Sequence, residues 1–177
     1  MDKVYDFMRK EMDLGHQCFV IYPIIEESEK MDWKASDTGY KKLSEKIFKD
    51  YKVGYIHGKM KKETKDEQMS AMANNEVQCL VSTTVVEVGI DIPNATIMVI
   101  ENSERFGLTQ LHQLRGRIGR GTNQSYCILV QRKFTPIADY RLKVMENTSN
   151  GFKISDEDLQ LRGPGEFFGK KQHGYMR

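Results

Sequence analysis

Short runs of apolar residues recur along the chain, separated by longer segments in which apolar and charged residues mix. The runs are apolar at nearly every position, a pattern that favours strands buried on both faces of a sheet. They cover residues 18–22, 53–56, 79–81, 95–100 and 127–130. The sequence therefore predicts five buried strands.

The segments between these runs have helical periodicity. One apolar stripe repeats every three or four positions between lysines and glutamates, through Tyr40, Leu43, Ile47 and Tyr51. This spacing predicts a helix with one buried face. Further helices are expected over residues 61–73 and 108–118, with a lead-in helix over the first 14 residues. Because strands that alternate with helices need crossover connections, we expect an α/β fold with a parallel sheet flanked by helices on both sides.

After residue 133 the pattern changes to helices and a loop. A helix is expected over residues 136–150 and a shorter one over 155–161, with Gly151 as the stop between them. The tripeptide Gly163-Pro164-Gly165 excludes regular structure and predicts a loop. The expected parts are a lead-in helix (1–15), an α/β domain (16–133) and a helical hairpin plus loop (134–177).

Length and composition fit one soluble domain. The chain has 177 residues, 39% of them apolar, which suffices for one core of ordinary size. Its apolar runs fall far short of the roughly 20 residues that a membrane span requires, and the N-terminus lacks the apolar stretch of a signal peptide. We therefore expect a cytoplasmic protein without membrane contact. Cys18, Cys79 and Cys127 lack metal-ligand spacing, so we expect core residues and no metal site.

Positive charge is concentrated in one segment. The whole chain carries a formal charge of +2, whereas residues 101–134 hold six basic and two acidic side chains, a local +4. In the expected helix, Arg117 and Arg120 share a face, and Gly116 and Gly119 leave room for a polyanion. Arginine can bind phosphate oxygens through two parallel hydrogen bonds. A solvated basic helix face and an arginine–glycine tail remain open alternatives.

Two motifs resemble those of superfamily 2 helicases. Gln113-Leu-Arg-Gly-Arg117-Ile-Gly-Arg120 resembles motif VI, and the segment from Ser82 to Pro93 resembles motif V. The resemblance implies a RecA-like fold of the P-loop NTPase superfamily, in the role of helicase domain 2. Tyr22-Pro-Ile-Ile-Glu-Glu-Ser-Glu29 and Leu161-Arg-Gly-Pro-Gly-Glu-Phe-Phe-Gly169 resemble the RecG family of branch-migration helicases more than the related transcription-repair coupling factors.

This resemblance implies roles at the nucleotide. Arg117 and Arg120 match arginine fingers that reach the γ-phosphate of ATP, with Gln113 supporting the same network. Arginine fingers stabilise charge that develops in phosphoryl transfer and contribute about 10³ to 10⁵ in rate. Gly89 and Asp91 match positions at the nucleotide ribose, where the glycine leaves room and the carboxylate makes contact.

The resemblance also implies DNA contacts and a translocation motif. Contacts to the DNA backbone are expected from Ser82, Thr83, His57 and Lys59. For His57, a turn histidine with local hydrogen bonds remains an alternative. The hairpin and loop from residue 134 resemble a motif that converts ATP-driven motion into DNA movement, with Arg162 and Gln172 at coupling positions. The alternative for Arg162 is a simple ion pair with Asp158, four residues earlier.

Two motifs of a complete ATP motor do not occur in the sequence. It has no glycine-rich loop ending in Lys-Ser or Lys-Thr, and no strand ending in Asp-Glu. We therefore expect a chain that is inactive alone, with ATP and Mg²⁺ bound mainly by an upstream motor domain and with a wedge domain upstream.

The expected function is that of a motor domain in an ATP-dependent DNA helicase. By resemblance, its substrate would be branched DNA, such as forks and Holliday junctions, in recombination and replication-fork repair. A coupling-factor-type translocase and a stand-alone nucleic-acid-binding module remain the alternatives.

Overall fold

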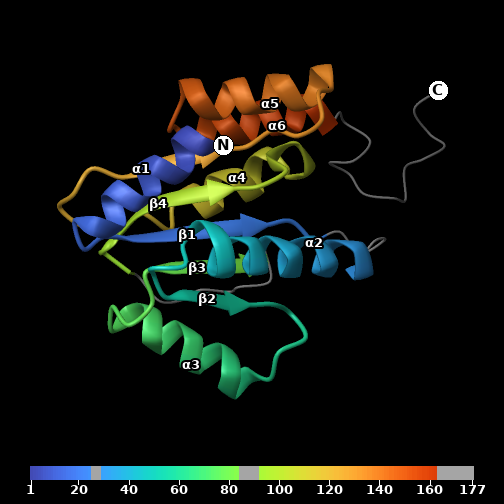
Figure 1. The fold of residues 1–177 in the computed structure, drawn as a ribbon. Coiled ribbons are helices and arrows are strands. Elements are labelled where there is room, and N and C mark those ends of the chain that lie inside the picture. Colours follow the sequence, from blue (N-terminus) through green and yellow to red (C-terminus); the bar gives the residue numbers. More distant parts are fainter. Residues whose placement is uncertain (25–28, 84–91, 163–177) are drawn as a thin grey trace.

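A computed structural model describes residues 1–24, 29–83 and 92–162. Its five strands form one sheet in the order β2-β3-β1-β4-β5 (Figure 1). The strands are β1 (Gln17–Tyr22), β2 (Val53–Ile56), β3 (Cys79–Thr83), β4 (Ala95–Ile100) and β5 (Tyr126–Leu129). All neighbouring pairs are parallel. The predicted α/β fold is confirmed, and each strand lies within two residues of its expected bounds.

Helices cover both faces of the sheet. Alternate residues of β1 enter different cores, because successive side chains of a strand point to opposite faces. Cys18 and Val20 pack on one face with α1 (Asp2–Asp13) and η2 (Leu43–Ile47), the π-helical end of α2 (Glu29–Lys42). Phe19 and Ile21 pack on the other face. That face is covered by α3 (Lys62–Ala73), α4 (Leu108–Arg115), α5 (Pro136–Asn147) and α6 (Gly151–Arg162).

The helix predicted from the stripe between Tyr40 and Tyr51 ends earlier than expected. Its last turn is a π-helix in which the Phe48 amide donates to the Leu43 carbonyl at 2.7 Å, and Phe48 is fully buried. Tyr51 lies in the turn that follows, where its hydroxyl donates to the Asp13 carboxylate at 2.5 Å. The apolar stripe therefore continued beyond the helix into a turn that packs on the same core.

The C-terminal hairpin is confirmed, with one correction. Gly151 does not separate two helices but is the first residue of α6. The Asn150 side chain explains this start, because its Oδ1 accepts hydrogen bonds from the amides of Phe152 and Lys153. The hairpin turn therefore lies at residues 148–150, and α6 is longer than the predicted 155–161.

Cys18 and Cys79 are core residues, as predicted, and Cys127 is partly buried and packs against the core. Cys18 and Cys79 are buried and lie opposite each other in the register of β1 and β3. Burial raises the pKa of Cys79 to about 12 and that of Cys127 to about 11. All three thiols, including Cys18, are therefore protonated at neutral pH. Among the helices of the described ranges, none is long and apolar enough to cross a membrane.

Candidate nucleotide and DNA sites at opposite ends of the sheet

The motif VI segment leaves the helix sooner than predicted. α4 ends at Arg115, with Gly116 as its C-cap, so Arg117 and Arg120 do not share a helical face. Gly119 has a φ of +81°, a left-handed conformation, and a Cβ there would lie 2.6 Å from the Ser125 hydroxyl. The expectation of two glycines inside a helix is therefore wrong. Gly119 is required by the turn itself, whether or not a ligand approaches.

This motif VI turn lies at the amino end of the sheet, where the strands begin. A Cβ on Gly121 would lie 2.6 Å from the carbonyl oxygen of Pro93, two residues before β4. Ser125, which abuts Gly119, immediately precedes β5. Gln113, Arg117 and Arg120 are all exposed there. The Arg120 Nε donates to the Gly116 carbonyl at 3.2 Å and so lies across the C-terminus of α4.

The residues expected to contact DNA gather at the carboxyl end of the sheet, where the strands finish. Ser82 and Thr83 end β3, and His57 and Lys59 follow β2, its neighbour in the sheet. Ser82 and Thr83 are each only 1% exposed, and the Ser82 hydroxyl donates to the Thr83 carbonyl at 3.0 Å. The DNA contacts of these hydroxyls stay predictions. Gly89, Asp91 and Gln172 lie outside the described residues.

His57 is held in a turn by a local hydrogen bond. Its Nδ1 accepts from the Lys59 amide at 3.2 Å, which is the contact that the turn-histidine alternative predicts. Partial burial lowers the pKa of His57; Asp37 opposes this shift, and Lys65 and Lys59 reinforce it. The imidazole is therefore neutral at pH 7. Its predicted role at the DNA backbone is not tested by these contacts.

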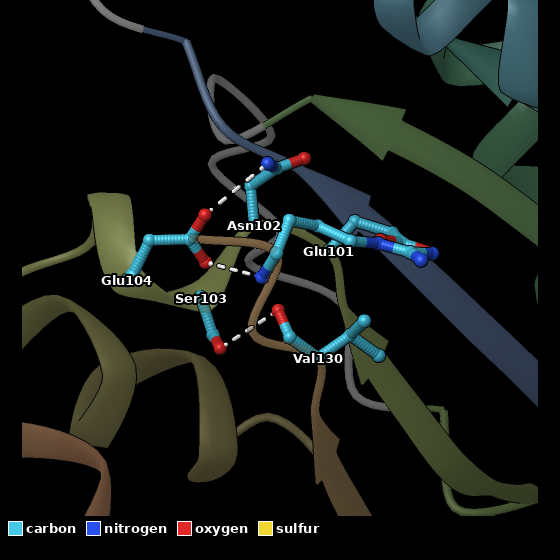
Figure 2. Close-up of polar contacts among 6 residues, drawn as sticks. Glu101, Asn102, Ser103, Glu104 and Val130 are labelled. Atoms are coloured by element: carbon cyan, nitrogen blue, oxygen red, sulfur yellow. Dashed lines mark hydrogen bonds and ion pairs between the residues drawn. The ribbon is translucent and has the colours of Figure 1, made fainter. Parts of the chain in front are cut away.

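A partly buried ion pair joins the carboxyl ends of β4 and β5, next to the hydrogen bonds of Glu104 and Ser103 that Figure 2 shows. The Arg132 guanidinium donates to both oxygens of Glu101, at 3.0 and 3.1 Å, and Glu101 is only 5% exposed. The Glu104 carboxylate accepts from the backbone amides of Arg132 and Lys133, and the Ser103 hydroxyl donates to the Val130 carbonyl. Part of the positive charge of residues 101–134 is thus neutralised internally, away from the motif VI turn.

Arg115 connects motif VI to the hairpin, a role that sequence reasoning missed. Its guanidinium donates to the carbonyls of Met145 and Thr148, at 2.7 and 3.0 Å, at the C-terminal end of α5. A cation is favourable there because the last helical carbonyls have no partner within the helix and carry partial negative charge. Arg115 stands inside the motif, but no sequence signal distinguishes a side chain that turns back onto the protein.

A second arginine fastens the same helix at the other end of the sheet. Arg141, on α5, donates to the carbonyls of Phe106 and Glu104, at 3.0 and 3.2 Å. Arg162, at the end of α6, forms an ion pair with Asp158 at 3.1 Å. This is the contact expected if Arg162 has no coupling role. Arg162 also lies near Gly107, which caps the start of α4. The hairpin thus extends from the motif VI turn to the carboxyl end of the sheet.

A parallel sheet in this order, with an exposed arginine-rich turn between its last two strands, is the arrangement of a RecA-like helicase domain. A family model for the helicase conserved C-terminal domain matches residues 1–122, and the chain belongs to this family. The resemblance to RecG is also confirmed. The chain is 52% identical over 97% of its length to the ATP-dependent DNA helicase RecG of Synechocystis sp., and 51% identical over 98% to that of Thermotoga maritima.

The chain spans only 21–22% of the length of these two relatives. A solved structure of RecG bound to a three-way DNA junction is similar in both fold and sequence, with a TM-score of 0.77 and 46% identity. That match covers 94% of this chain and 21% of the other. The likeness therefore concerns one domain of a larger enzyme.

Proposed function

We propose that this chain is the second motor domain of an ATP-dependent DNA helicase that unwinds and branch-migrates forked DNA and Holliday junctions. The proposal rests on a sequence identity of 51–52% to RecG proteins over almost the whole chain. The solved RecG relative supports the substrate class, because it is bound to a three-way DNA junction. The site of action would be cytoplasmic, with upstream motor and wedge domains as partners in the same protein.

The motif VI turn suits an ATP phosphate held by another domain. Arg117 and Arg120 are exposed, carry only hydrogen-bond donors, and keep their charge at any physiological pH. Gln113 lies one helical turn before Arg117 and would support them. Within the described residues, no group of three His, Cys, Asp or Glu could hold a metal ion. Mg²⁺ would be held with the nucleotide by the other motor domain, where it neutralises phosphate charge.

The hairpin suits a coupling role because of where its parts lie. Its turn is bonded to Arg115, next to motif VI, and α6 then leads back to the carboxyl end of the sheet. A shift of the motif VI turn on ATP binding would move α5 through the Arg115 hydrogen bonds. α6 would carry that displacement to Arg162 and on to the segment that contains Gln172.

The test is removal of each arginine in the complete enzyme that carries this chain. Arg117→Ala and Arg120→Ala should each lower DNA-stimulated ATP hydrolysis by a factor of about 10³ or more. Affinity for fork DNA should stay within a factor of two. Lys133→Ala is the matched control, because this exposed cation lies in the same basic segment but outside motif VI. Near-normal turnover in both arginine variants would remove the assignment.

A further inference from the structure

Four aromatic rings form a ladder at the carboxyl end of β2. Tyr40 and Tyr55 are stacked with their centroids 4.8 Å apart, and Tyr55 lies 5.2 Å from the His57 ring. Trp33, near the start of α2, meets His57 edge-on at 6.2 Å. Exposure increases outward along the ladder, from 8% for Tyr55 to 40% for Trp33. The largest ring of the ladder, the only tryptophan in the sequence, therefore presents surface to solvent.

Hydrogen bonds of Ser36 hold the ladder in place. The Tyr55 hydroxyl is hydrogen-bonded to the Ser36 hydroxyl at 2.6 Å, and Ser36 also donates to the Trp33 backbone carbonyl at 2.9 Å. Ser36 is fully buried, and its bond to Tyr55 is shielded from water. The two bonds join the turn of α2 that carries Trp33 to strand β2. A ring fixed before binding loses little conformational entropy when a flat ligand stacks on it.

Positive charge accompanies the ladder. Residues 57–65 contain four lysines and one glutamate, a local charge of +3. Lys59 is exposed, and the Lys65 Nζ donates to the Gly58 carbonyl at 3.3 Å. Asp37 is the acidic group that acts on His57 from α2. Aromatic rings beside a row of cations are the arrangement by which proteins hold single-stranded nucleic acid, through base stacking and phosphate attraction.

We propose that Trp33 and His57 form a stacking surface for an unpaired DNA base, with the adjoining phosphate beside Lys59. The inference rests on the proposed function, in that it requires DNA at the carboxyl end of the sheet. The contacts expected from the sequence were to the DNA backbone alone, whereas this inference adds a contact to a DNA base. A neutral imidazole suits this role, because it can stack without the cost of desolvating a charge. An apolar protein partner is disfavoured, because Lys59 and Lys65 lie close enough to His57 to act on its charge, and such a partner offers them no anionic group.

The single tryptophan provides the measurement. Intrinsic fluorescence is recorded while the chain is titrated with a short oligothymidylate, and with an abasic oligonucleotide of equal length and charge. The oligothymidylate should quench Trp33 emission to saturation, whereas the abasic strand should leave it almost unchanged. Emission that responds equally to both strands, or to neither, would contradict stacking.

Variants separate this inference from the proposed function. Anisotropy of the labelled oligonucleotides gives affinity without relying on the tryptophan. Trp33→Leu should weaken oligothymidylate binding about tenfold and leave abasic binding unchanged, while Trp33→Phe keeps most of the affinity. Unchanged thermal melting shows that the variants fold. If Trp33→Leu binds oligothymidylate as tightly as the parent does, the stacking proposal is wrong, whereas the proposed DNA-binding function is unaffected. Absence of binding by the parent to both strands counts against both proposals.

Discussion

The two ends of the sheet differ in how they are built. At the amino end, buried side chains close the surface: Gln17 donates to the carbonyls of Met72 and Val77, at 2.7 and 2.6 Å. Among the described residues, the motif VI turn presents two exposed arginines at this end. At the carboxyl end, the exposed Trp33 ring and the exposed Lys59 flank His57, which follows β2. Parallel sheets usually bind their own ligands at the carboxyl end. Arginines at the opposite end suit a ligand that another domain holds.

The largest expected effect tests the connection between the two ends. Arg115→Met removes two charge-assisted hydrogen bonds to carbonyls of α5 and should lower the free energy of unfolding by about 2 kcal/mol. Urea denaturation followed by circular dichroism measures this change. Lys133→Met, an exposed cation outside the motif VI turn, is the control and should change stability by less than about 0.5 kcal/mol. Equal stability of both variants would show that the Arg115 bonds do not fasten the hairpin.

A smaller effect is expected from the turn at the amino end. Gly119→Ala places a side chain at a φ of +81° and 2.6 Å from the Ser125 hydroxyl. Gly15→Ala is the matched control, because Gly15 has a φ of +88° but nothing within 4 Å of its Cβ position. The control should cost about 1 kcal/mol for backbone strain alone. Gly119→Ala should cost more in thermal unfolding; an equal cost would mean that Ser125 moves aside freely.

At the carboxyl end, a modest effect on DNA affinity is expected. Lys59→Ala should weaken binding of single-stranded DNA a few-fold and reduce the slope of log affinity against log salt by about 0.7. Filter binding over a range of sodium chloride concentrations measures the slope. Lys133→Ala, a cation elsewhere on the surface, should leave it unaltered. If the two variants give the same slope as the parent, Lys59 does not meet a phosphate.

The smallest effect concerns the protonation of His57. Its pKa should fall below the ordinary 6.5, chiefly because burial disfavours the imidazolium. Because the unfolded chain binds this proton more readily, the stability that His57 contributes is present above pH 6.5 and lost as pH falls through the lowered pKa. An NMR titration of the ring protons reports the midpoint. Lys65→Ala should raise it slightly, and a parent midpoint above 6.5 would contradict the structure.

The sequence predicts the strands well because each is a continuous apolar run that only a buried position explains. Helix ends are predicted less well. The apolar stripe continues past Ile47 into a turn, and Gly151 begins a helix because the preceding Asn150 caps it. The motif residues were found by resemblance, but the sequence cannot show that Arg115 turns back onto α5. The contact between Trp33 and His57 depends on the packing of α2 beside β2, so no local pattern reveals it.

The strand order has a consequence for how the domain folds. β1 comes first along the chain among the strands of this sheet, yet it lies in the middle of the sheet. Its Cys18 pairs with Cys79, 61 residues later, and with Ile97, 79 residues later. No hairpin can form early, because all strand pairs are parallel and distant in sequence. The central strand therefore has no partner until Cys79, 61 residues after Cys18, has been synthesised, which slows folding and exposes an apolar segment to aggregation.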